Sequence, residues 1–447
     1  MTNHSHLIAY QNIPEPLLTF NPERDDCISI HPLKGLIEYG PYNQKLIGNA
    51  FPIIRVATMG PKGTHKIISE LINQLKSRQT PPEINIEISQ EQETIVLNAD
   101  KPYKKLADLF TQLISKIANN KYDFDILYVY LPQNWYPTFE CKADEDFDLH
   151  DYIKALCVGY GIPTQIIREN KSLQYPCQCS VMWHLGIATY SKITGVPWKL
   201  AQMSPDTAYI GMSYALRNNR EKSKFVTCCS QVFDAEGSGM EFVAYETSDF
   251  RLESRDNPYL SKDEIRRVMS RCLSIYQERN AGKPPKNIVI HKSTEFKEEE
   301  VDGCYDALKV CSDIELVQIQ QNVHWKAIKV DGNNDIAGYP VNRGTTLRLD
   351  NDLLLWTQGN VDISQRGRHF YKEGRGIPEP ILLKRFAGHN SWYDSAHSIL
   401  GLSKMNWNSD SLYDRLPVTL EFAQKLARTI KRMPNLEAKP YQYRFFM

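Results

Sequence analysis

The sequence has 447 residues, more than one hydrophobic core usually serves, so two or three domains are expected. Hydrophobic residues make up 42% and charged residues 24%, a composition that indicates a folded chain and argues against extensive disorder. Lys plus Arg and Asp plus Glu each total 53, so a general attraction for polyanions is excluded, and nucleic acid would need a local basic channel.

The compartment is predicted from what the sequence lacks. The start, MTNHSHLIAYQNIPEP, has no basic segment followed by an apolar core, and no apolar run approaches the roughly 20 residues of a membrane span. The ten cysteines include the pairs Cys177 and Cys179 and Cys228 and Cys229, without the spacing of a zinc site. A cytoplasmic protein with reduced thiols and no membrane contact is expected.

Residues 1–50 are rich in turn-forming residues. The segments IPEPLLTF and HPLKGLIEYGPY are interrupted by proline and glycine, which favours short extended pieces over a separate core. We expect this stretch to be a packing arm on another domain.

Residues 51–200 alternate between strand and helix patterns. The strands are FPIIRVATMG, DILYVYLP and the end of GIPTQII; the helices include THKIISELINQLKS, residues 103–118 and VMWHLGIATYSK. The turn GPKGTHK lacks the spacing of a nucleotide P-loop. An α/β fold with a doubly wound parallel sheet is predicted, with its ligand site beyond the carboxyl ends of the strands.

Residues 201–447 change pattern. The runs DTAYIGMSYA, KFVTCCSQVFD and MEFVAYE predict an antiparallel meander, followed by a helix at 262–279, the strand NIVIH, a helix at 298–311 and the strand IELVQIQ. That order is the order of a ribonuclease H-like fold. Three further strands are predicted at HWKAIKV, GTTLRLD and DLLLWTQ, and helices at about 395–402 and 420–431.

A basic strip lies between residues 365 and 386. It contains Arg366, Arg368, His369, Lys372, Arg375, Lys384 and Arg385 against only two acidic residues, Glu373 and Glu379. On charge alone a solvated loop is favoured over a nucleic-acid contact.

In combination these pieces resemble the Argonaute family, specifically the short prokaryotic Argonautes that contain only MID and PIWI domains. The resemblance is carried by EPLLTF, PLKGLIEYGPY, IPTQII, YSKITGVPW, TAYIGMSYA, NIVIHKS and KMNWNSDSLYDRLPVTLEFAQKLA. It implies a MID domain at residues 51–200 and a ribonuclease H-like PIWI domain at residues 201–447, after the arm at 1–50.

The resemblance implies that the MID domain holds the 5′-phosphate of a guide strand. His150 and Lys154 stand at i and i+4, on one helix face, and Gln165 and Lys192 complete the implied set. By spacing alone, the alternative that His150 and Lys154 are surface residues and Gln165 is unrelated to them is as well supported as phosphate binding. The carboxylate of the last residue, Met447, is implied to help hold Mg²⁺ beside the phosphate.

The resemblance also implies a degenerate nuclease site. Cleaving members hold two metal ions with aspartates where this sequence has Ser213 and Ser293, and a neutral hydroxyl is a poor ligand for a hard dication. Lys292 is expected to place a cation beside that site. The alternative is a metal-dependent, guide-directed nuclease that uses other carboxylates, of which Glu246 and Glu253 are candidates.

Inactive short Argonautes work with an effector that carries an APAZ domain, commonly a sirtuin-like or TIR-type enzyme that consumes NAD, sometimes a nuclease. The resemblance therefore implies a heterodimer in prokaryotic defence against plasmids and phages. The expected partners are a guide RNA, a single-stranded target DNA and the APAZ effector, with a higher oligomer on activation. A scaffold that binds no guide is the further alternative.

Overall fold

The computed structural model describes residues 10–24, 26–43, 54–75, 84–88, 102–139, 147–201, 206–219, 222–232, 240–247, 249–253, 257–330, 333, 335–338, 340–361, 376–409, 411–432 and 440–447. By contacts the chain separates into two compact units. Unit 1 contains Met1–Tyr39, Trp198–Asn406 and Ser411–Ala427; unit 2 contains Gly40–Pro197, Trp407–Asp410 and Arg428–Met447. The domain boundaries expected at residues 50 and 200 stay predictions.

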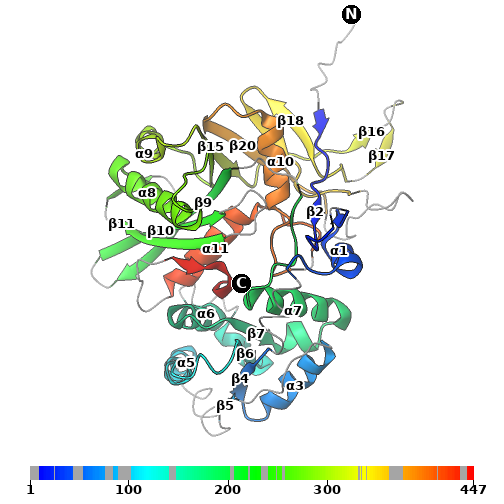
Figure 1. Ribbon diagram of the computed structural model, residues 1–447, viewed down its shortest axis with the longest axis vertical. Coiled ribbons are helices and arrows are strands. Elements are labelled where there is room, and N and C mark those ends of the chain that lie inside the picture. Colours follow the sequence, from blue (N-terminus) through cyan, green and yellow to red (C-terminus); the bar gives the residue numbers. More distant parts are fainter. Residues whose placement is uncertain are drawn as a thin grey trace, which may run out of the picture. The chain divides into compact units, whose positions relative to one another are not determined.

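Unit 2 is built on a parallel sheet of strands in the order β5-β4-β6-β7 (Figure 1). The strands are β4 (Val56–Pro61), β5 (Ile84–Ile88), β6 (Ile126–Leu131) and β7 (Thr164–Arg168). The helices between and after them are α3 (Thr64–Gln74), α5 (Pro102–Ala118), α6 (Leu149–Tyr160) and α7 (Gln178–Lys192). Short helical turns η1 (Gln133–Thr138), η2 (Glu169–Leu173) and η4 (Tyr443–Phe445) complete the unit.

Alternating strand residues bury both faces of this sheet. On one face Met59 and Val129 pack with Phe110 of α5 and Leu156 of α6. On the other face strand residues such as Tyr128 pack with side chains of α3 and α7. Parallel strands with helices on both faces make the doubly wound sheet that the sequence predicts.

Unit 1 contains a mixed sheet that includes the order β1-β18-β19-β20-β15-β14-β9-β10-β11. Its central strands are β9 (Thr207–Asn219), β10 (Lys222–Val232), β11 (Met240–Thr247), β14 (Asn287–Lys292) and β15 (Asp313–Gln320). Strands β9 to β11 form an antiparallel meander, and β14 lies parallel to both β9 and β15. The predicted ribonuclease H-like order is confirmed.

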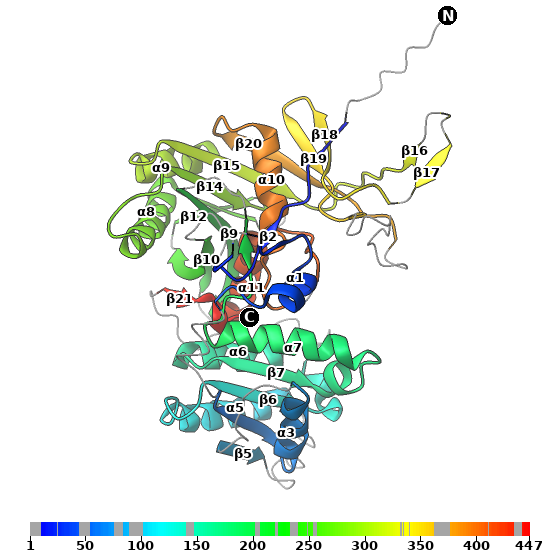
Figure 2. The ribbon, with the colours of Figure 1, turned by 45° about the vertical axis from the view of Figure 1, so that its right-hand side comes forward.

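Helices cover both faces of this sheet in unit 1 (Figure 2). On one face α8 (Lys262–Arg279) and α9 (Glu298–Leu308) pack on the even-numbered residues of β9 and β14, such as Ile210 and Ile290. On the other face lie α10 (Trp392–Leu402) and α11 (Val418–Lys431). A Cβ added at Gly211 would lie 2.1 Å from the carbonyl oxygen of Thr419, so α11 packs directly on β9.

The remaining strands of unit 1 extend this sheet or form small sheets beside it. They are β1 (Tyr10–Asn12), β2 (Leu18–Thr19), β3 (Ile28–Ser29), β8 (Lys199–Leu200), β12 (Phe250–Glu253), β13 (Asn257–Leu260), β16 (Lys329–Val330), β17 (Ile336–Gly338), β18 (Thr345–Leu349), β19 (Asp352–Leu355) and β20 (Ile381–Ala387). Strand β1 pairs with β18, so the expected N-terminal arm does pack on this unit.

Three local expectations were wrong. HPLKGLIEYGPY was expected to be extended, but Pro32–Tyr39 form α1, since proline is favoured at the first position of a helix. HWKAIKV was expected to be one strand, but only Lys329–Val330 pair, in β16. Ile381–Ala387 form β20 at the end of the basic strip, where no strand was predicted.

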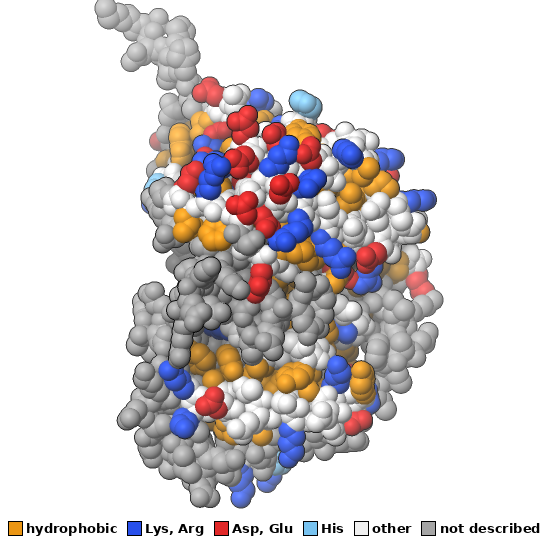
Figure 3. Space-filling view, turned by 90° about the vertical axis from the view of Figure 1, so that its left-hand side faces the viewer, with side chains coloured by type: hydrophobic (Ala, Val, Ile, Leu, Met, Phe, Trp, Pro, Cys, Tyr) orange, Lys and Arg blue, Asp and Glu red, His pale blue; other side chains and the backbone are white. Residues whose placement is uncertain are grey.

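The surface of unit 1 over α8 and α9 carries both signs of charge. Figure 3 shows Lys and Arg side chains interspersed with Asp and Glu there. Several form ion pairs, including Arg251 with Glu299 and Lys262 with Asp306. A mixed surface of this kind does not attract a polyanion. Among the described residues, no helix has the length and apolar character needed to cross a membrane.

His291 on β14 gives the fold a pH dependence. Its side chain is 1% exposed, its Nδ1 lies 2.9 Å from Thr419 Oγ1, and burial lowers its pKa to about 3. The stabilising neutral form is fully present above the ordinary pKa of about 6.5 and is lost as the pH falls from there toward 3. The native state therefore forfeits up to about 5 kcal/mol over that range.

We expect His291→Asn to lose less unfolding free energy than the wild-type chain between pH 7 and pH 4. Urea unfolding followed by circular dichroism measures the difference. Equal losses in the two proteins would contradict a neutral, buried imidazole at this position.

Candidate guide-end pocket and degenerate nuclease site

Helix α6 positions the first candidate cluster in unit 2. Asp148 caps its start by accepting a hydrogen bond from Asp151 N at 3.1 Å, and Gly161 ends it in the left-handed region at φ 70°. Leu149, Ile153 and Leu156 face the sheet core, while Lys154 lies on a different side of the helix and is only 6% exposed. The local sequence thus buries a lysine at a fixed point of the helix.

Lys154 is held by backbone oxygens. Its Nζ donates to Thr164 O at 2.6 Å and to an oxygen of Met447. Met447 is itself 4% exposed, so the last residue of the sequence is buried beside Lys154. Its oxygen already faces a cation, which does not fit a metal ion at the same oxygen.

Lys192 contacts Gln165, the residue that follows the Thr164 contacted by Lys154. Lys192 stands in the last turn of α7, is 1% exposed, and donates from Nζ to Gln165 Oε1. Gln165 follows Thr164 in β7, so the two lysines approach neighbouring residues of one strand. We name Lys154, Gln165, Lys192 and Met447 the guide-end pocket. The structure brings three of the four residues of the predicted phosphate set together here.

The guide-end pocket lies at the amino end of β7. Thr164 and Gln165 are the first two residues of that strand, and α7, which follows the strand, returns Lys192 to the same end. The sequence predicted a site beyond the carboxyl ends of the strands. This cluster lies at the opposite end, because the two lysines lie on helices whose side chains reach back to where β7 begins, and the predicted location of the ligand site stays a prediction.

His150 lies one turn before Lys154 and is partly exposed. Its Nδ1 is 3.2 Å from Asp151 Oδ1, and Asp151 also pairs with Arg432 at 3.3 Å. Burial alone would raise the pKa of Asp151, but the hydrogen bond and charge of His150, with Arg432 and Arg428, lower it on balance. His150 is therefore the outermost member of the predicted set, with its imidazole held by a carboxylate.

Asp148, His150 and Asp151 each offer one ligand atom within 4.8 Å of the others. Two carboxylates and an imidazole suit a transition metal better than Mg²⁺, which prefers oxygen ligands alone. Arg432 already supplies a cation to Asp151. We assign no ion to this group.

The predicted nuclease position lies in unit 1, where β9 and β14 run in parallel. The last paired residues are Met212 and Lys292, so Ser213, within β9, and Ser293, directly after β14, are the next residues along the two segments. Ser213 faces the side of α11, where His291 meets Thr419. Ser213 is partly buried and Ser293 is exposed. The two serines therefore lie near each other where the pairing of β9 with β14 ends.

Lys292 does not lie beside that position, and this expectation was wrong. Its side chain points to the face of α8 and α9, is completely buried, and pairs with Glu300 at 2.7 Å. It also lies 5.0 Å from the ring centre of Tyr259. Burial lowers the pKa of Lys292, and the charge of Glu300 opposes that shift. Successive strand residues alternate between faces, which separates Lys292 from Ser293.

The two carboxylates considered as substitutes are placed differently. Glu246 is exposed on β11, and β10 separates β11 from the strand of Ser213, so the backbones are about 10 Å apart. Two-metal sites hold their ions about 3.5–4 Å apart within one ligand set. Glu253 pairs with Lys297 at 2.9 Å. Neither glutamate is therefore placed to replace the aspartates expected at Ser213 and Ser293.

The basic strip is described only in part. Arg366, Arg368, His369, Lys372 and Arg375 lie outside the described residues. Lys384 on β20 is 40% exposed and lies 3.5 Å from Asp352. Arg385 is 17% exposed, pairs with Glu315 at 2.8 Å and stacks on Trp392, so a phosphate would have to displace an internal partner.

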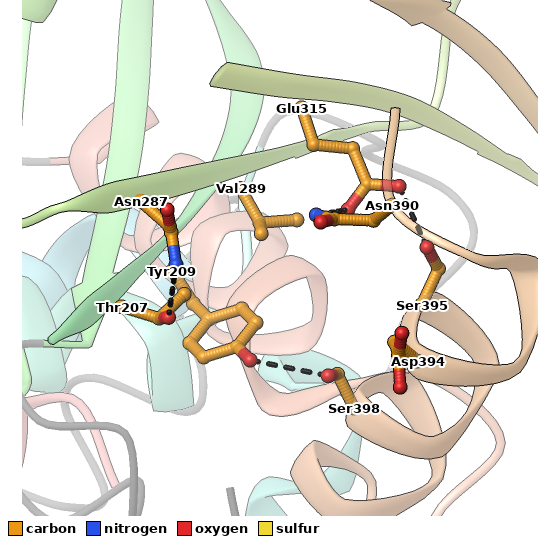
Figure 4. Close-up of a pocket in the computed structure, with 9 residues that line it drawn as sticks. All are labelled: Thr207, Tyr209, Asn287, Val289, Glu315, Asn390, Asp394, Ser395 and Ser398. Carbon is orange, nitrogen blue, oxygen red and sulfur yellow. Dashed lines mark hydrogen bonds between the residues drawn. The ribbon is translucent and has the colours of Figure 1, made fainter. Parts of the chain in front are cut away.

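A small polar pocket lies at the other end of the same strands (Figure 4). Thr207 and Asn287 begin β9 and β14 and line it together with Glu315, Ser395 and other side chains. Glu315 accepts hydrogen bonds from Asn390 at 3.0 Å and from Ser395 at 2.6 Å. This pocket is at the amino ends of the strands, away from Ser213 and Ser293.

Comparisons with known proteins find similarity to Piwi-domain and Argonaute proteins. The family profile described as Piwi domain matches residues 141–435. Protein argonaute of Cereibacter sphaeroides is 24% identical over 330 residues, covering 67% of this chain and 40% of that protein.

Solved structures agree in fold. Clostridium butyricum Argonaute bound to a guide DNA and a 19-mer target DNA aligns with a TM-score of 0.70 at 17% identity, over 100% of this chain and 56% of that one. A. aeolicus Argonaute aligns with a TM-score of 0.60 at 16% identity, over 98% and 55%. The chain thus spans a little over half of these structures and 40% of the curated relative.

Proposed function

The chain belongs to the family of proteins with a Piwi domain, and on that premise we propose that it binds a guide strand and recognises complementary nucleic acid without cutting it. The guide is RNA and the target is single-stranded DNA. Base pairing supplies the sequence recognition, while the protein holds the backbone, in part through Lys384 and the undescribed residues Arg366, Arg368, Lys372 and Arg375.

One observation carries the proposal: two buried lysines converge on the first residues of one strand. Lys154 and Lys192 are 6% and 1% exposed; Lys154 donates to Thr164 O, and Lys192 donates to the side chain of Gln165, the next residue of the strand. Burying ammonium groups is costly unless charge and hydrogen bonds compensate, and a terminal phosphate offers up to two negative charges and several acceptor oxygens.

The test is equilibrium binding of 5′-phosphorylated and 5′-hydroxyl RNA guides of one sequence. We expect tighter binding of the phosphorylated guide and a weaker preference in His150→Ala. Lys105→Ala, an exposed lysine on α5, is the matched control and should keep the wild-type preference. Equal affinity for both guides in the wild-type chain would refute the anchoring role of the guide-end pocket.

Absence of cleavage follows from two missing ligands. We expect Ser213→Asp alone to remain unable to cut a labelled target in Mg²⁺ or Mn²⁺, because Ser293 still leaves the two-metal site incomplete. A time course of the guide-loaded protein with a complementary DNA measures this. Cut products from the single variant would show the inactivity argument to be mistaken.

The alternative is a guide-directed nuclease that uses other carboxylates. The positions of Glu246 and Glu253 disfavour it. Cleavage by the wild-type chain that disappears in Glu246→Gln or Glu253→Gln would favour it over the proposal.

We propose further that the chain signals to a partner protein. The chain activates an APAZ-containing effector, a sirtuin-like, TIR-type or nuclease protein, in prokaryotic defence, with a higher oligomer as the active form. Incubation of the guide-loaded chain with such an effector and NAD tests it. Target DNA should start NAD loss with a sirtuin-like or TIR-type effector. NAD loss that does not depend on target DNA would instead support the alternative of a scaffold that binds no guide.

A further inference from the structure

The turn that follows α7 holds a residue in a strained conformation. The helix ends at Lys192, and Thr194 N then donates to Ser191 O at 3.2 Å. Gly195 N donates to Tyr190 O at 2.8 Å. These two bonds make a Schellman motif, in which the residue at positive φ is usually glycine. Here that residue is Thr194, at φ 83°, where a β-branched side chain makes the conformation costly.

The side chain of Asn43 holds this turn, although it lies 151 positions before Thr194. Its Oδ1 accepts hydrogen bonds from Val196 N at 2.7 Å and from the hydroxyl of Tyr190 at 2.8 Å. Its Nδ2 donates to Thr194 O at 3.4 Å. One amide group therefore bonds to the helix end before Thr194, to Thr194 itself and to the chain after it.

The turn also packs closely on the ring of Tyr190. A Cβ added at Gly195 would lie 2.3 Å from Cδ1 of that ring, so the backbone crosses the ring where a side chain does not fit. The hydroxyl of the same tyrosine donates to Asn43. Asn43 and Tyr190 thus hold the turn together, and their hydrogen bonds offset the cost of the strained residue.

The conformation of this turn determines where Lys192 lies. Lys192 is the last residue of α7, two positions before Thr194, and its buried Nζ donates to the side chain of Gln165. If the turn relaxed, the last turn of the helix would lose the hydrogen bonds that close it. Lys192 would then be displaced from Gln165 and from the guide-end pocket.

We propose that Asn43 is a positioning residue of the guide-end pocket. It stabilises the strained turn at Thr194 and thereby keeps Lys192 in place for the 5′-phosphate. The inference rests on the proposed function, because that function gives Lys192 its ligand. Asn43 acts through the backbone of the turn, so its replacement should change the preference for a terminal phosphate and not the binding of the rest of the strand.

The first test compares Asn43→Ala with the wild-type chain on 5′-phosphorylated and 5′-hydroxyl RNA guides of one sequence. We expect the preference for the phosphorylated guide, measured as the ratio of the two dissociation constants, to fall about three- to tenfold. Asn120→Ala changes an exposed asparagine after α5 and should keep the wild-type ratio. A folded Asn43→Ala protein with the wild-type ratio would overturn the proposal.

The second test adds Thr194→Gly to Asn43→Ala. Glycine adopts a positive φ without a steric clash at Cβ, so the turn should form without Asn43 and the double variant should recover most of the phosphate preference. A double variant with the same ratio as Asn43→Ala would contradict a role that acts through the strained turn.

Hydrogen exchange of the guide-free proteins follows the turn itself. The amides of Thr194 and Gly195 close the turn, so they should exchange faster in Asn43→Ala and return toward the wild-type rate in the double variant. Unchanged exchange in Asn43→Ala would overturn the proposal. This measurement needs no guide, so it separates two kinds of failure: equal affinity of the wild-type chain for both guides would refute the proposed function, whereas the exchange rates decide whether Asn43 fixes the turn.

Discussion

Replacement of Lys154 by alanine is expected to remove about 10- to 100-fold of the preference for a 5′-phosphorylated guide. A charge-assisted hydrogen bond contributes about 1.5–3 kcal/mol, and Lys154 is one of the two buried cations of the guide-end pocket. The measurement is the ratio of dissociation constants for 5′-phosphorylated and 5′-hydroxyl guides. The ratio is unchanged by any loss of affinity that is equal for the two guides.

Two controls make this result specific. Lys105→Ala removes an exposed lysine from α5 and should leave the ratio unchanged. Lys154 also donates to Thr164 and Met447, so the melting temperature of the variant shows how much of any loss is structural. A folded Lys154→Ala protein with the wild-type ratio would rule out Lys154 as a phosphate ligand.

Replacement of Glu300 by alanine is expected to destabilise unit 1 by about 3–5 kcal/mol. It would leave Lys292 fully buried without its counter-ion. It would also remove the acceptor for Leu260 N at 3.2 Å and for Lys297 N at 3.0 Å. Urea unfolding of the two proteins at neutral pH measures the difference.

The neighbouring residue supplies the control. Glu299 lies on the same turn of α9, but its pair with Arg251 is exposed, so Glu299→Ala should cost about 0–1 kcal/mol. Equal costs for the two variants would contradict a buried, mutually compensating Lys292–Glu300 pair.

Most helices and strands were predictable from the periodic spacing of apolar residues. The helix expected at 262–279 forms at those residues because its apolar positions, such as Ile265 and Met269, recur on one face and a serine caps its start. A wrong prediction arose where strand pairing with distant segments determines the structure. Ile381–Ala387 become β20 only because β15 and β19 lie on either side, which the local pattern of that segment does not encode.

The candidate site was predictable where it depends on local spacing or on the resemblance. Lys154 and Lys192 contact the neighbouring residues Thr164 and Gln165 from separate elements, while their binding of a phosphate stays a prediction. The face toward which Lys292 points depends on strand register, which is set by the pairing of β14 with β9 and not by the local sequence.

The proposed function depends most on whether the chain carries a guide with a phosphorylated 5′ end. Recovering the protein from cells, extracting its nucleic acid and sequencing it with and without prior removal of 5′-phosphates tests this directly. We predict short RNAs whose 5′ ends are phosphorylated, and their loss from a Lys154→Ala, Lys192→Ala double variant. A wild-type protein that carries no short nucleic acid, or one with predominantly 5′-hydroxyl ends, would contradict the account.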